Sequence, residues 1–167
     1  MLIRRLVPSD ASAFLALRLA ALLDCPTAFS SSYEEERSTS LATIEARLGP
    51  QSGRCMFGAF EEDALAGMLG LGREDGHKVH HKGFLRGIYT VPAQRGKGAA
   101  RKMLQQALEA ARAMEGLQQI TLTVTSSNEA ALALYKSLGF SAYGRAPRAL
   151  LVDGVFHDDV HMVLEFG

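Results

Sequence analysis

The fold is decided by residues 84–104, which read Phe-Leu-Arg-Gly-Ile-Tyr-Thr-Val-Pro-Ala-Gln-Arg-Gly-Lys-Gly-Ala-Ala-Arg-Lys-Met-Leu. The first eight residues are largely apolar and favour a strand, which Pro92 ends. A loop of glycines and basic residues, 95–98, follows, and a segment with helical periodicity begins at about Ala99. The first N–H groups of a helix have no internal acceptor, and the helix dipole makes that end partly positive. Strand, glycine loop and helix together therefore predict a site for a phosphate-bearing cofactor.

Composition places the chain among ordinary globular domains. Its 167 residues favour a single domain, and 47% of them are hydrophobic while 22% are charged. Eighteen basic and eighteen acidic residues balance, which argues against a nucleic-acid-binding surface. We find no apolar run long enough to span a membrane and no signal peptide, so we expect no membrane partner and a cytoplasmic location. Two cysteines and five scattered histidines suggest neither a disulfide framework nor a metal site.

Periodicity along the rest of the chain predicts an α/β fold, with a mixed sheet and helices on both faces. Strands are expected at residues 2–7, 54–60, 64–72, 84–91, 120–125, 140–144, 149–152 and 155–166. Helices are expected from about 11 to 24, 41 to 48, 99 to 114 and 129 to 138. Ser9 or Asp10 is the expected cap of the first helix, and Asn128 that of the last.

Two common phosphate-binding motifs do not fit residues 84–104. A dinucleotide-binding loop needs a third glycine where this chain has Arg101, and an acid after the next strand, where this chain has Thr125. A P-loop needs serine or threonine after its lysine, and here Gly98 follows Lys97. The cofactor is therefore expected to be neither a dinucleotide nor a P-loop nucleotide.

Two sequence blocks resemble the GNAT N-acetyltransferase superfamily. The run Arg95-Gly96-Lys97-Gly98-Ala99-Ala100 is similar to its acetyl-CoA signature, which is Gln or Arg, two residues, Gly, one residue, then Gly or Ala. The second block comprises Asn128-Glu129-Ala130-Ala131, Leu134-Tyr135 and Leu138-Gly139-Phe140. The order and separation of the blocks also match, and Asp153-Gly154 with Asp158 and Met162 is similar to small-molecule members.

The resemblance implies a GNAT-like, mostly antiparallel sheet of about seven strands, with a splay between the two central strands. Residues 1–167 would form a single N-acetyltransferase domain that uses acetyl-CoA as acetyl donor. Tyr135 would lie near the sulfur and protonate the leaving thiolate. Asn128 would lie near the pantetheine arm. The other expected cofactor contacts are the strand backbone at Ile88, Tyr89 and Thr90, and, for the pyrophosphate, Arg95, Gly96, Lys97, Gly98, Ala99, Ala100 and Arg101.

The acceptor and the general base stay open at this stage. The first expectation is direct acetyl transfer to a small-molecule amine, and the alternatives are a protein N-terminus or lysine, or a non-catalytic acyl-CoA-binding regulatory domain. Phe29, Tyr33 and Glu35 are candidate substrate contacts, because residues 29–36 match the superfamily's variable acceptor loop. Some relatives carry a glutamate base where this chain has Thr123. The remaining candidate bases are His80, His81, His157, Asp158 and Glu35. Dimers are common in the superfamily, so a homodimer is also open.

Overall fold

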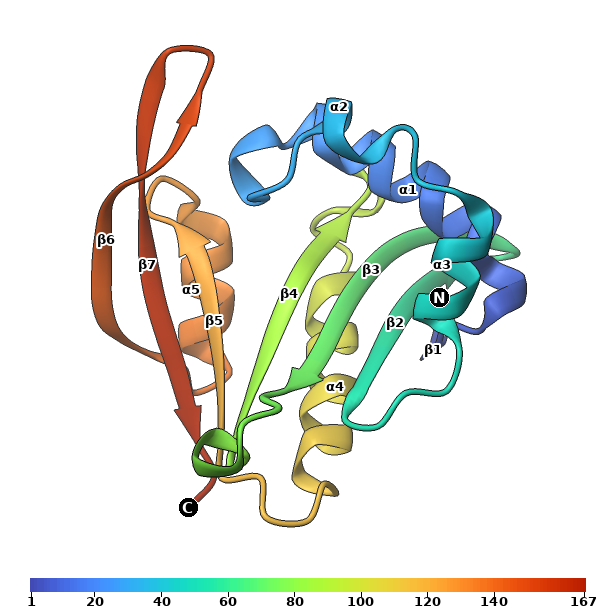
Figure 1. The fold of residues 1–167 in the computed structure, drawn as a ribbon. Coiled ribbons are helices and arrows are strands. Elements are labelled where there is room, and N and C mark those ends of the chain that lie inside the picture. Colours follow the sequence, from blue (N-terminus) through green and yellow to red (C-terminus); the bar gives the residue numbers. More distant parts are fainter.

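A seven-stranded sheet runs through the centre of the computed structural model, which describes all residues from Met1 to Gly167 (Figure 1). The strands are β1 (Leu2–Arg5), β2 (Arg54–Glu61), β3 (Ala64–Arg73), β4 (Lys82–Thr90), β5 (Gln119–Thr125), β6 (Ser141–Val152) and β7 (Val155–Glu165). Their order across the sheet is β1-β2-β3-β4-β5-β7-β6. Only the central pair, β4 and β5, is parallel, and all other neighbours are antiparallel. The expected mixed, mostly antiparallel sheet is confirmed.

Helices cover both faces of the sheet, as expected. They are α1 (Ala11–Asp24), α2 (Tyr33–Glu36), α3 (Leu41–Leu48), α4 (Ala99–Arg112) and α5 (Glu129–Ser137), with short 3-10 turns at Pro8–Asp10, Pro26–Ala28, His77–Val79 and Pro92–Gln94. One core joins α1 and α3 to the sheet, and a second core, on the other face, joins α4 and α5 to it. No helix is both long and apolar enough to pass through a bilayer.

Several boundaries differ from the sequence-based expectation. The first strand ends at Arg5 rather than at residue 7, and α4 ends at Arg112 rather than at 114. Residues 141–152 form one long strand instead of two short ones, because two shifts in register with β7 absorb the irregular residues between them. A left-handed residue, Arg148 (φ 51°), lies at the second shift.

The two expected helix caps behave differently. Asn128 caps α5 as expected, because its Oδ1 accepts from the N–H of Ala131 at 3.1 Å. Asp10 makes no cap bond to α1. Its carboxylate instead forms a two-pronged ion pair with Arg4 at 2.7 and 2.8 Å and accepts from the N–H of Val7. A charged partner from the neighbouring strand thus takes the oxygens that the cap would have used.

Candidate functional site

The two central strands separate along their length and leave a cavity between them. Strands β4 and β5 pair at only three positions, the last being Phe84 opposite Thr121. Beyond that point β5 stays paired to β7 as far as Thr125, whereas β4 turns away (Figure 1). The expected splay is therefore confirmed. The cavity within it is lined by Ala28, Leu85, Arg86, Gly87, Ile88, Leu122, Thr123, Val124, Thr125, Asn128 and Tyr135.

A bulge in β4 lies at this cavity. Arg86 pairs with Gly70 and Tyr89 with Met68, so two residues of β4, Gly87 and Ile88, face a single residue of β3. Gly87 adopts φ 61°, a conformation that favours glycine because it has no Cβ. Beyond Phe84, the edge of β4 that faces β5 has no strand partner, so backbone groups there are free to bind an extended ligand.

The glycine loop and the start of α4 form a cradle of unpaired backbone donors. None of the N–H groups of residues 96–101 has an acceptor within the protein. Gly96 (φ 74°) and Gly98 (φ 85°) adopt the left-handed backbone conformation that this turn requires. A Cβ added to either would meet no atom within 4 Å. The cradle is therefore open to a ligand. Six consecutive donors at the positive end of a helix suit a pyrophosphate.

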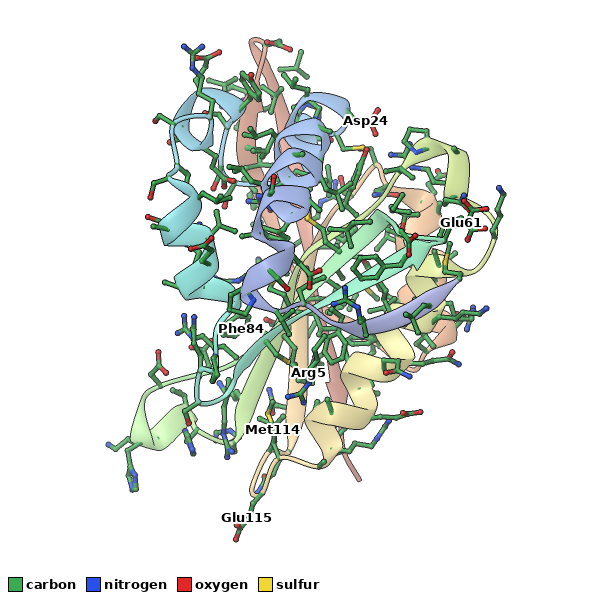
Figure 2. All side chains as sticks on the ribbon, turned by 90° about the vertical axis from the view of Figure 1, so that its right-hand side faces the viewer. Arg5, Asp24, Glu61, Phe84, Met114 and Glu115 are labelled. Atoms are coloured by element: carbon green, nitrogen blue, oxygen red, sulfur yellow. The ribbon has the colours of Figure 1, made fainter.

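Two basic side chains at this loop and at the start of α4 already have partners within the protein. Arg95 turns toward the end of α1, where its guanidinium binds the carboxylate of Asp24, and its Nε donates to the carbonyl of Thr90 at 3.0 Å. Figure 2 shows Asp24 beyond the end of α1, on the side of this loop. Arg101 donates to Ser137 of α5 at 2.7 Å. Lys97 is exposed and unpaired, so it is the cation of the loop that remains free for a phosphate.

Asp24 ties the loop to β4 as well. The hydroxyl of Tyr89 donates to the same carboxylate at 3.0 Å, and the hydrogen bonds from Arg95 and Tyr89 lower the pKa of Asp24. Burial and the bond to Asp24 raise the pKa of Tyr89 to about 12. The side chain of Thr90, next along β4, is buried, and its Oγ1 has no partner.

Tyr135 and Asn128 reach the cavity from α5. Tyr135 is only 7% exposed, and its ring packs edge-on against Phe140 with centroids 6.1 Å apart. Its hydroxyl makes no hydrogen bond, although the residue lines the cavity. Burial raises the pKa of Tyr135 to about 12, so the phenol keeps its proton near neutral pH. An unpaired, protonated hydroxyl facing a cavity can serve as an acid there.

Comparison with known proteins decides the family. Residues 19–140, most of the chain, match the family model described as "Acetyltransferase (GNAT) family". The chain belongs to the GNAT family. A GNAT acetyltransferase from Streptococcus pneumoniae has the same fold with a TM-score of 0.88 and is 26% identical, and the match covers 99% of both chains.

Curated GNAT relatives match over shorter stretches. N-alpha-acetyltransferase 30 of Schizosaccharomyces pombe is 32% identical over 96 residues, which cover 57% of this chain and 63% of the relative. The L-methionine sulfoximine/L-methionine sulfone acetyltransferase of Pseudomonas aeruginosa is 38% identical over 61 residues, covering 36% of this chain and 35% of the relative. The chain thus spans less than two thirds of either relative, and the two names refer to different acceptors.

The candidate bases expected from the sequence lie away from the cavity between β4 and β5 or already have hydrogen-bond partners in the protein. His80 and His81 precede the paired end of β4, which begins at Lys82, roughly 20 Å along the strand from Ile88 at the usual rise per residue. His157 pairs with Leu150, in the hairpin beyond the end of β5. Asp158 is bound by Arg145 and by the backbone N–H of Arg148.

A pair that sequence reasoning missed lies at the cavity instead. Thr123, which lines the cavity, is opposite His161 of β7, and its Oγ1 lies 3.1 Å from the His161 Nδ1. Asp159 lies two residues earlier on the same face of β7, where burial raises the pKa of its carboxyl group. The alternation of His157, Asp159 and His161 along a strand is a signal that could have directed attention to this face.

The candidate acceptor residues lie between α1 and α3. Phe29 is buried in the core beneath the guanidinium of Arg18, with 4.6 Å from the Cζ atom to the ring centroid. Tyr33 begins α2 and is half-buried against the same core. The carboxylate of Glu35 accepts from the N–H of Ser32 at 2.7 Å and so helps to cap α2. Only neighbouring Ala28 of this segment lines the cavity, so the acceptor role of these three residues stays a prediction.

Proposed function

We propose that the chain is a single-domain N-acetyltransferase that moves an acetyl group from acetyl-CoA directly to an amine. The acceptor that we propose first is an amine of a small molecule. The observation that carries this proposal is the row of six unpaired N–H groups at residues 96–101, next to a gap in the sheet. A pyrophosphate fits that row, and a pantetheine arm fits the unpaired edge of β4. Membership of the GNAT family agrees with this use of the site.

The residues present fit the pyrophosphate and the pantetheine arm of acetyl-CoA. The backbone from Gly96 to Arg101, with Lys97, would hold the pyrophosphate, and the backbone at residues 88–90 would hold the pantetheine arm. The free amide of Asn128 would bind the same arm, because only its Oδ1 is used in capping α5. When bound, acetyl-CoA supplies an acetyl thioester, which an amine attacks readily.

The protein would contribute an acid and a base on the walls of the cavity. Tyr135 holds a proton at Oη, from which it can pass to a departing thiolate. On the other wall, the Thr123 hydroxyl can accept a proton from the amine and pass its own proton to the Nδ1 of His161. This relay takes the place of the glutamate that some relatives carry at position 123, and it needs the tautomer of His161 with an unprotonated Nδ1.

A thiol-release assay tests the function. Acetyl-CoA is offered with a panel of amines, amino acids, polyamines and peptides, and CoA binding is measured in parallel by calorimetry. We expect micromolar CoA binding and thiol release that depends on an amine. Binding without release with any amine would favour the non-catalytic acyl-CoA-binding role, and release only with peptides would favour a protein acceptor. No binding of CoA would refute the proposal. A cytoplasmic location and a homodimer stay predictions.

A further inference from the structure

One cation at the cavity has no partner in the protein. Arg86 lies in β4 immediately before the bulge and lines the cavity, and its guanidinium makes no hydrogen bond or ion pair. Its guanidinium lies over the ring of Phe84, with 5.3 Å from Cζ to the ring centroid. Its Cγ and the Sδ of Met56 lie against the same side of Gly70, so Arg86 points to the sheet face that α1 and α3 cover.

Three further arginines lie close enough to act on the charge of Arg86. Burial lowers the pKa of Arg86, as do the positive charges of Arg54, Arg18 and Arg47. Arg18 is paired with Glu36 at 2.8 Å, and Arg54 is paired with Asp75 at 2.7 Å. Arg47 and Arg86 form no ion pair with an acidic side chain. Positive charges that lie close together favour the binding of an anion.

The three acids of α2, which lie within the acceptor loop (residues 29–36), are not bonded to Arg86. Within α2, Glu34 pairs with Arg37 at 3.1 Å, Glu35 helps to cap the helix, and Glu36 is held by Arg18. Glu34 and Glu36 are therefore paired within the protein, and none of the three α2 acids is bonded to Arg86. A Cβ built on Gly87 would lie 3.4 Å from the Nη1 of Arg18, so a second guanidinium reaches the bulge.

We propose that the acceptor amine carries a carboxylate, which binds the guanidinium of Arg86 beside that of Arg18. The inference rests on the proposed acetyl transfer and names the substrate class of the same cavity. A planar guanidinium with free donors matches a carboxylate in a two-pronged geometry. The acceptor is therefore an amino-acid-like amine rather than a polyamine. The same carboxylate chemistry would be supplied by a free amino acid or by an acidic residue at a peptide N-terminus.

Matched acceptor pairs test the inference without any mutation. Thiol release is measured for free amino acids against their amides, and for peptide amides that begin with aspartate against those that begin with asparagine. We expect the carboxylate member of one set to have a kcat/KM higher by about tenfold or more, as for a charge-assisted hydrogen bond. The set that shows the preference identifies the source of the carboxylate. Equal kcat/KM within both sets would overturn the inference.

Variants at Arg86 locate the effect. Arg86→Gln should remove the preference, mainly by raising the KM of the carboxylate acceptor, while Arg86→Lys should keep most of it. Arg54→Gln is the matched control, because it removes an equal charge that is paired with Asp75 and does not line the cavity. A preference that survives Arg86→Gln, or that Arg54→Gln abolishes equally, would contradict the role of Arg86.

Binding separates this inference from the proposed function. Calorimetry with the preferred carboxylate acceptor and CoA-bound protein should give binding that Arg86→Gln weakens about tenfold or more, whether or not acetyl transfer occurs. Such binding without thiol release would refute the catalytic proposal and leave the carboxylate site standing. Thiol release from amines that does not depend on Arg86 would support the catalytic proposal and refute the carboxylate site.

Discussion

Replacing Tyr135 by phenylalanine removes the proposed acid and little else. The ring and its 6.1 Å edge contact with Phe140 remain, and the lost hydroxyl has no hydrogen-bond partner in the protein. The free energy of unfolding should therefore change by less than about 1 kcal/mol, whereas Tyr135→Ala, which also deletes the ring, should cost about 3–5 kcal/mol. A positioned acid contributes about 10² to 10⁴ in rate, so Tyr135→Phe should lower kcat by at least about a hundredfold.

The assay measures kcat at saturating acetyl-CoA by thiol release, with the dissociation constant of acetyl-CoA from calorimetry. The dissociation constant should stay within about threefold, and the rate deficit should be constant from about pH 7 to pH 10, because the pKa of Tyr135 is raised to about 12. A Tyr135→Phe enzyme with wild-type kcat would refute the acid role, and a parallel loss of acetyl-CoA affinity would indicate binding instead.

Three further predictions concern stability. Gly98→Ala should lower the free energy of unfolding by about 1–2 kcal/mol in urea titrations, because φ 85° strains any residue with a Cβ; Gly144→Ala, where φ is not positive, should change it by less than about 0.5 kcal/mol. Asp24→Asn should lower Tm at pH 7, because it weakens the hydrogen bond from Arg95. Since folding lowers the pKa of Asp24, the higher Tm of the wild type should be present above about pH 4 and should be lost as the pH falls further. An equal Tm of the two proteins at pH 7 would contradict the role of this ion pair. The raised pKa of Tyr135 makes the folded state hold a proton that the unfolded state releases above about pH 10, so Tyr135 should contribute a fall in stability of about 1.4 kcal/mol per pH unit between 10 and 12, beside a similar fall from Tyr89, whose pKa is raised to the same value; a slope that Tyr135→Phe leaves unchanged would exclude the contribution of Tyr135.

Local signals predicted most of the fold because they act over a few residues. The apolar run before Pro92, the glycines that follow it and the helical period after Ala99 each have one favoured local structure, and all three appear where expected. Asn128 was predictable as a cap for the same reason, since its partner is three residues away. Strand ends were less predictable, because the pairing partner and not the strand decides where pairing stops.

The side chains of the candidate site were predictable only in part. Tyr135 lies at the cavity as the motif implied, because its helix starts from a cap encoded beside it. Arg95 belongs to the motif as well, yet its guanidinium binds Asp24, which is 71 residues away in the sequence. Thr123 and His161 meet only because β5 pairs with β7 in one register. A long-range partner of this kind leaves no trace in local spacing.

By itself, the sequence determined a glycine loop with unpaired donors at the start of a helix, since φ above zero and free N–H groups follow from local chemistry. It also determined the second block that places Asn128 and Tyr135 after the next strand. The tertiary structure alone decided that β4 leaves β5 after Phe84, and which charges meet there. Long-range ion pairs consume Arg95 and Arg18 and leave Arg86 without a partner, because charge pairing depends on distances in space rather than on order along the chain.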